Sequence, residues 1–229
     1  MKAFNKSHEM LVMVATALGD ELLKDVAFLG GCTTGLFLTD VVSKEAVRYT
    51  DDVDLITHVV GYPGWLDFQK RIRKRGFKES MEDNINCRMR LEGLIVDFMP
   101  DDENILGYSN CWYREALKEA KEHTLTEHLI IKLITPVYFI ATKLEAYNGR
   151  GKDDPMQSRD IEDILSVIDG RVELVEEIKC ASGEIQKYVS KQLTNILKHP
   201  DIGYVVQSTA QGLSDREDII FKRLESIIN

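Results

Sequence analysis

Closely spaced aspartates in the stretch RYTDDVDLI, residues 48–56, have the types and spacing of a metal site. Asp52 and Asp54 stand two positions apart in a β-branched run, so on an extended strand both side chains point to one face, about 6.6 Å apart. Two such carboxylates can share divalent cations, because the ions of two-metal phosphoryl-transfer sites lie about 3.5–4 Å apart. The alternative is a solvated turn, in which these residues and Asp51 hold no ligand.

A further carboxylate, Asp97, interrupts the apolar stretch IVDFM, residues 95–99. Burial of its charge without a partner would cost several kcal/mol. Asp97 therefore either faces water from an edge strand or serves as a third metal ligand and a proton acceptor. If its strand lies beside the strand of Asp52 and Asp54, the three carboxylates converge.

A glycine pair, Gly30 and Gly31, follows the short apolar run VAFL. Glycines between a strand and a helix let backbone N–H groups approach a phosphate, and Thr33 or Thr34 could add a hydroxyl. Ordinary turns also use glycine pairs. The pair therefore points to a phosphate site only in combination with the aspartates.

The elements that must position these residues alternate between strands and helices. We predict a helix over 7–24 with Ser7 as its N-cap, and strands over 26–31 and 53–60. A β-hairpin over 85–100 should turn at Glu92-Gly93. The remaining predictions are helices at 33–42, 63–76 and 111–123, and a strand or hairpin at 125–135.

From Pro136 onwards the hydrophobic pattern becomes helical. We predict helices over 136–150, 158–171, 173–197 and 214–228. The fold class is therefore α/β (α+β), with a mixed sheet and flanking helices followed by a helical domain. We predict an α/β domain over residues 1–135 and a helical domain over residues 136–229.

The composition is that of a globular protein, with 229 residues, 44% of them apolar and 29% charged. No run of about 18 apolar residues is present, which predicts no membrane span. The first twenty residues lack a signal-peptide pattern, and the four cysteines have no paired metal spacing. Both features predict a cytoplasmic protein with reduced thiols.

The net charge of −9 argues against nucleic-acid binding over a broad surface. A local basic patch nevertheless occurs in KRIRKRGFK, Lys70 to Lys78. It is either a solvated helix face or a contact for a nucleic acid or a triphosphate. Arg88 and Arg90 share strand parity and could extend it towards the aspartates.

The predicted elements follow one another in the order strand, Gly-Gly turn, helix, DxD strand, helix, and hairpin with a third aspartate. In this order the chain resembles the nucleotidyltransferase superfamily that includes DNA polymerase beta. More narrowly, it resembles the AbiEii-type nucleotidyltransferases, toxins of type IV toxin–antitoxin systems. The matching stretches, within residues 26 to 171, are GGCTTGLFLTD, VRYTDDVDLI, GLIVDFMP, LGYSNCWY and YFIATKLEAYNGRGKDD…SRDIEDILSVIDGR.

The resemblance implies a Mg²⁺-dependent enzyme that transfers a nucleotide from an NTP to an acceptor hydroxyl. Asp52 and Asp54 would bind two Mg²⁺ ions, and Asp97 would complete one metal site and help deprotonate the acceptor. The turn at Gly30 and Gly31 would hold the β- and γ-phosphates. Positioning and charge neutralisation dominate such reactions.

The resemblance also implies further nucleotide contacts. Lys143 would reach the triphosphate, although a lysine that snorkels to the surface is the ordinary alternative. Asp160 lies three residues before Asp163, on the same face of the first turn of a predicted helix. It would orient Lys143 or the nucleotide. The other expected contacts are Arg48, Thr50, Cys32 and Thr33, each with a turn or packing role as its alternative. The run from Gly31 to Asp52 is longer than in most members, which leaves open whether Cys32, Thr33 or Thr34 supplies the usual hydroxyl.

By the same likeness, the acceptor would be the 3′ end of a tRNA, and the partner an antitoxin protein. Two alternatives stay open at this point. The acceptor could be a small molecule, as in antibiotic nucleotidyltransferases, or the chain could bind a nucleotide without chemistry.

Overall fold

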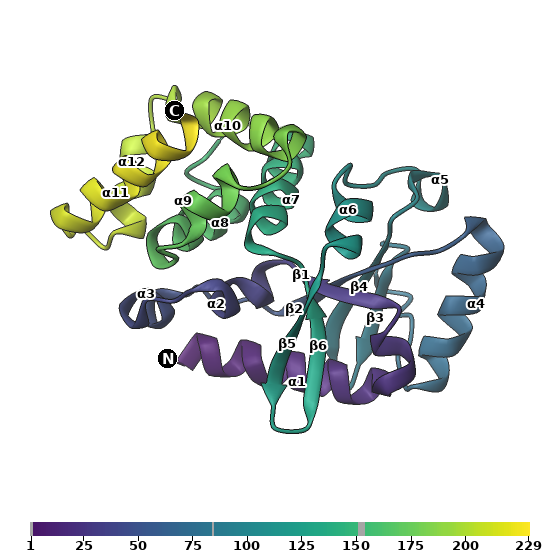
Figure 1. Ribbon diagram of the computed structural model, residues 1–229. Coiled ribbons are helices and arrows are strands. Elements are labelled where there is room, and N and C mark those ends of the chain that lie inside the picture. The colour runs from purple at the N-terminus through teal and green to yellow at the C-terminus, as the bar shows by residue number, and fades with distance from the viewer. Residues whose placement is uncertain (1, 84, 151–153) are drawn as a thin grey trace. The chain divides into compact units, whose positions relative to one another are not determined.

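The computed structural model describes residues 2–83, 85–150 and 154–229 (Figure 1). Within these residues the chain divides into two compact units. The sheet unit comprises Lys2–Thr33 and Tyr49–Thr135, and the helical unit comprises Thr34–Arg48 and Pro136–Asn229. The α/β class predicted from the sequence is confirmed.

A mixed six-stranded sheet in the order β3-β4-β2-β1-β6-β5 forms the centre of the sheet unit. Its strands are β1 (Val26–Leu29), β2 (Asp52–Thr57), β3 (Arg88–Leu91), β4 (Leu94–Pro100), β5 (Lys121–Thr126) and β6 (Leu129–Leu133). Strand β2 pairs antiparallel with β1 and parallel with β4. The four residues of β1 are buried, and β1 also pairs in parallel with β6.

The predicted hairpin over 85–100 is present, and the segment predicted as a strand or hairpin over 125–135 belongs to a second hairpin. Strands β3 and β4 are joined at Glu92-Gly93, whose φ angles of 50° and 91° are those of a tight turn between antiparallel strands. Strands β5 and β6 form the second hairpin. It begins at Lys121, because residues 121–123 are part of a strand and not of the predicted helix.

Short and long helices complete the sheet unit: α1 (Lys2–Leu23), the 3₁₀ turn η1 (Gly31–Thr33), α4 (Gly61–Lys74), α5 (Glu103–Leu106) and α6 (Tyr113–Lys118). Helix α1 packs against β1, β2, β5 and β6. Phe68 of α4 lies edge-on to Phe98 of β4, with ring centroids 5.6 Å apart. These contacts bury the apolar residues that alternate with the polar ones on β2 and β4.

The helical unit consists of α2 (Thr34–Phe37), α3 (Val41–Ala46), α7 (Pro136–Gly149), α8 (Arg159–Gly170), α9 (Leu174–Lys179), α10 (Gly183–Leu197), α11 (Ile202–Thr209) and α12 (Ser214–Ile228). Helix α8 contacts α2, α3, α7, α11 and α12. The rings of Phe37 and Phe139 lie 4.7 Å apart, and the N–H groups of Thr39 and Asp40 both donate to the carbonyl of Gly170.

The structure corrects the predicted domain division at one segment. Residues 34–48 group with the helical unit and not with the sheet, because their contacts include α7, α8 and α12. The single predicted boundary, at Pro136, coincides with the start of the second segment of the helical unit.

Several helix boundaries also differ from the prediction. Ser7 is a buried residue inside α1 and not its N-cap, because the helix begins five residues earlier. The helix predicted over 33–42 is two short helices, and the one predicted over 173–197 is broken before Gly183, where α10 begins. Helix α11 was not predicted.

Among the residues that the structure describes, none forms a helix with the length and apolar character needed to cross a membrane.

Candidate metal centre

Asp52, Asp54 and Asp97 meet in the sheet unit, as their spacing predicted. Each offers a carboxylate oxygen, and the three oxygens lie within 4.8 Å of one another. Asp97 is buried, and the other two are half-buried. Three like charges at this separation repel each other, and a divalent cation with hard oxygen ligands relieves that repulsion.

The register of the central strands brings the carboxylates together. Asp54 on β2 is the direct partner of Asp97 on the parallel strand β4. Asp52 shares a face with Asp54 because it lies two residues earlier, whereas Val53 and Leu55 between and after them are buried on the other face. The apolar residues of both strands thus fix the face on which the aspartates lie.

Gly30 lies directly against this cluster. Its φ of +79° is in the left-handed region, which favours glycine. A Cβ atom at this position would lie 1.9 Å from Oδ2 of Asp54, which is too short for a non-bonded contact, so any side chain here would clash with Asp54. The turn that the sequence marked as a phosphate cradle is therefore in contact with the carboxylate cluster.

Two of the three side chains expected to add a hydroxyl or thiol contact in this turn, Cys32 and Thr33, are hydrogen-bonded inside the protein. The buried thiol of Cys32 donates to the carbonyl of Ser7 at 3.5 Å, and Thr33 Oγ1 donates to the carbonyl of Gly30 at 2.8 Å. Thr34 Oγ1 is buried and has no hydrogen-bond partner among the described residues. Thr50 Oγ1 donates to Oδ1 of Asp52, which agrees with its predicted position beside the aspartates.

Arg88 is the partner of Asp97 that sequence reasoning missed. Its Nε donates to Oδ1 of Asp97 at 2.8 Å, and its Nη2 donates to Oδ2 at 2.7 Å. This hydrogen-bonded pairing raises the pKa of Arg88 above its ordinary value, so the guanidinium stays charged. The alternation of Arg88 with apolar residues indicates the face on which it lies, but no local pattern indicates that Asp97 is its neighbour.

Cys87 and Tyr108 lie within electrostatic reach of the same cluster. Burial raises the pKa of Cys87 to about 11, and the negative charge of Asp97 adds to this effect. Burial also raises the pKa of Tyr108 to about 12. Because both pKa values lie well above 7, the thiol and the phenol are neutral at pH 7. The two groups lie 3.8 Å apart.

Lys143 and Asp160, two of the expected nucleotide contacts, belong to a charged cluster in the helical unit. Lys143 Nζ lies 3.1 Å from Oδ1 of Asp160 and 2.7 Å from Oδ2 of Asp163, and both aspartates are buried on α8. Arg48 donates two hydrogen bonds to Asp163, and Arg150 Nη1 donates to Asp160 at 2.6 Å. Lys143 is thus an ion-pair partner of Asp160, and the orienting role of Asp160 stays a prediction. The nucleotide contacts of Lys143, Arg48 and Asp160 stay predictions.

The cations around Asp163 change its acidity. Burial alone would raise the pKa of Asp163, but the charges of Lys143 and Arg48 outweigh it and lower the pKa below the ordinary value of 3.8. Since the folded pKa is depressed, the cluster stabilises the fold fully above this ordinary value. That stabilisation is lost as the pH falls through the lowered folded pKa.

We expect Asp163→Ala to lower the free energy of unfolding by about 3–5 kcal/mol, because Lys143 and Arg48, whose side chains are only 11% and 14% exposed, would lose their shared buried carboxylate. Glu162→Ala is the matched control, since the adjacent Glu162 is half-exposed and lies 4.0 Å from Arg48. Its loss should cost about 1 kcal/mol or less. Urea unfolding followed by circular dichroism measures both values, and equal losses would contradict the structural role given to Asp163.

Two of the six cationic residues in the basic patch of residues 70–78 pair with nearby acids. Arg71 pairs with Asp25 at 2.8 Å, and Arg73 pairs with Glu79. Arg90 donates two hydrogen bonds of 2.8 Å to Asp83, so it does not extend a positive stripe with Arg88 as expected. These pairs favour the solvated-face interpretation of the patch.

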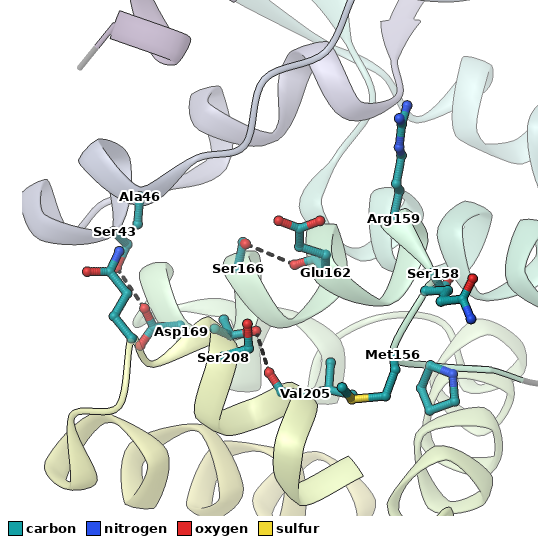
Figure 2. A pocket seen from close by; sticks show the side chains of 14 residues that line it. Ser43, Ala46, Met156, Ser158, Arg159, Glu162, Ser166, Asp169, Val205 and Ser208 are labelled. Atoms are coloured by element: carbon teal, nitrogen blue, oxygen red, sulfur yellow. Dashed lines mark hydrogen bonds between the residues drawn. The ribbon is translucent and has the colours of Figure 1, made fainter. Parts of the chain in front are cut away.

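A polar pocket of about 270 Å³ lies in the helical unit, between residues of α3, α8 and α11 and the residues before α8 (Figure 2). Two of its hydroxyl groups donate within the protein: Ser43 to Asp169 at 3.0 Å, and Ser166 to the carbonyl of Glu162 at 2.8 Å. No residue of the predicted site lines it. The pocket therefore adds nothing to the carboxylate cluster of the sheet unit.

Comparisons with known proteins leave this geometry as the main guide to function. A scan against protein-family models found no family that matches the chain, and a search of curated proteins found no matching relative. The candidate site consequently has to be interpreted from its own residues.

Proposed function

We propose that the sheet unit holds the centre of a Mg²⁺-dependent nucleotidyltransferase. The observation that carries this proposal is the convergence of Asp52, Asp54 and Asp97 within 4.8 Å of one another, with Gly30 against Asp54. A set of three carboxylates fits Mg²⁺, which prefers hard oxygen ligands and keeps positions open for water and phosphate. The AbiEii-type resemblance of the sequence supports the same activity.

In this proposal each group of the site has a defined task. The three aspartates hold the metal, which supplies neutralisation of the triphosphate charge and activation of the acceptor oxygen. Backbone N–H groups of the turn at Gly30 and Gly31 hold the β- and γ-phosphates, because the absence of a side chain permits close approach. The α-phosphate is then open to in-line attack by a hydroxyl, with pyrophosphate leaving.

The acceptor is the less constrained part of the proposal. The sequence resemblance favours the 3′ end of a tRNA, and it makes an antitoxin protein the expected partner. The pairing of Arg71 and Arg73 with acids, together with the net charge of −9, favours a small or cationic acceptor instead. A module that binds nucleotide without chemistry would need none of the three acidic groups.

Incubation of the protein with each labelled NTP, Mg²⁺ and either total RNA or a small-metabolite extract tests the activity. We expect label transfer by the wild type, and loss of transfer on chelation by EDTA and in the Asp52→Asn, Asp54→Asn double variant. The labelled fraction identifies the acceptor class. Equal labelling by the wild type and the double variant would refute the proposal, and tight NTP binding without turnover would favour the binding module.

A further inference from the structure

Arg88, Asp97 and Asp54 form one row across three neighbouring strands. Arg88 on β3 is the direct partner of Asp97 on β4, which in turn is the direct partner of Asp54 on β2. Because directly opposed residues share a face of the sheet, the guanidinium and the two carboxylates lie side by side. The side chains of Arg88 and Asp97 are 20% and 11% exposed, so water reaches their contact only in part.

The geometry of the contact limits what Asp97 can do. An ionised carboxylate has about four lone-pair positions, and the guanidinium of Arg88 occupies one on each oxygen. The remaining positions are the ones open to a cation. Bidentate pairing also fixes the plane of the carboxylate, which a single hydrogen bond would not do.

Charge leads to the same residue. When all three aspartates are ionised, the guanidinium of Arg88 offsets one of their three negative charges and so reduces the repulsion among them. The remaining negative charge still attracts a divalent cation. Because the environment of β4 is mainly apolar, this charge compensation stabilises the site more than it would at the surface.

We propose that Arg88 is the positioning residue of the metal centre. It holds the carboxylate of Asp97 in the orientation that presents its remaining lone pairs to the cation. This inference rests on the proposed function, because it presupposes that the aspartates bind a metal. The opposite role is a plug, in which Arg88 competes with the cation for Asp97.

Replacement by lysine separates these two roles. Arg88→Lys keeps the positive charge but cannot make the two-bond fork, so an effect on metal binding reports orientation and not net charge. The matched control is Arg90→Lys, because Arg90 lies on the same strand and makes the same two-bond fork, with Asp83 in place of Asp97.

Titration with Mn²⁺, followed by the electron paramagnetic resonance signal of the free ion, measures affinity without any substrate. We expect Arg88→Lys to weaken Mn²⁺ binding about 10- to 100-fold, as loss of an outer partner of a metal ligand typically does. Arg90→Lys should stay within about twofold of the wild type, with thermal melts showing that both variants fold. Unchanged or tighter binding by Arg88→Lys would overturn the positioning role.

A second measurement needs no variant. In wild-type protein labelled with ¹⁵N, the Nε–H signal of Arg88 should shift but persist when Mg²⁺ is added, because the fork stays bonded. Loss of the signal through exchange with water would show that the cation displaces Arg88, which refutes the positioning role. If the wild type binds no Mn²⁺, this inference and the proposed function both fall. If the wild type binds Mn²⁺ and Arg88→Lys binds it equally well, only the inference falls.

Discussion

Asp54→Asn is expected to slow nucleotidyl transfer at least about a hundredfold. Asp54 is central to the cluster: it is the strand partner of Asp97, and its Oδ2 lies against Gly30. Asparagine has the same shape but no charge, so the change removes metal attraction and leaves the packing in place. Metal ions contribute several kcal/mol to the stabilisation of such transition states, and each 1.36 kcal/mol corresponds to a factor of ten in rate. Initial rates of label transfer at saturating NTP measure the effect.

Asp51→Asn provides the control for this variant. Asp51 is an exposed neighbour of the same charge, one residue before β2 and outside the group whose oxygens converge. Its removal lowers the local negative charge equally, and we expect a rate within about twofold of the wild type because exposed charges are screened. Similar losses in both variants would mean that general charge, and not metal ligation, explains the result.

Gly30→Ala is expected to abolish Mn²⁺ binding and to destabilise the fold by more than the backbone strain alone. A non-glycine residue in the left-handed region costs about 1–3 kcal/mol. The methyl group would in addition lie 1.9 Å from Oδ2 of Asp54, so the carboxylate must move out of the cluster. Thermal and urea unfolding give the loss of stability, and Mn²⁺ titration gives the loss of the site.

Gly107→Ala isolates the backbone contribution. Gly107 has a φ of +77°, nearly that of Gly30, but an added Cβ would meet no atom within 4 Å. We expect this variant to lose about 1 kcal/mol of stability and to bind Mn²⁺ like the wild type. If the two glycine variants behave alike, the contact between Gly30 and Asp54 has no role in the metal centre.

The parts of the fold that could be predicted were those determined by local patterns. Alternating apolar residues and the Glu92-Gly93 turn predicted the hairpin of β3 and β4, and a lone acidic residue in that hairpin drew attention to Asp97. Local patterns predicted wrong helix boundaries where tertiary packing determines where a helix begins. Ser7 has the residue type of an N-cap, yet it lies inside α1 because the helix continues towards the N-terminus along the sheet.

The candidate site was predictable to a similar extent. Spacing indicated that Asp52 and Asp54 share a face, but no local signal could show that Asp97 would be the register partner of Asp54. The same limit explains why Arg88 was assigned to a positive stripe. Strand parity gives the face on which a side chain lies, whereas its neighbour depends on pairing between segments that are distant in the sequence.

Segment 34–48 has a consequence for the synthesis of the protein. It leaves the ribosome on the order of a hundred residues before α7 and α8, with which it packs, and at about 5–20 residues per second this gap lasts on the order of ten seconds. During that time Phe37 lacks Phe139, so an apolar ring stays accessible to chaperones. A nascent chain released after Thr135 would keep this apolar segment without its packing partners, and a single cut of the chain cannot separate the two units.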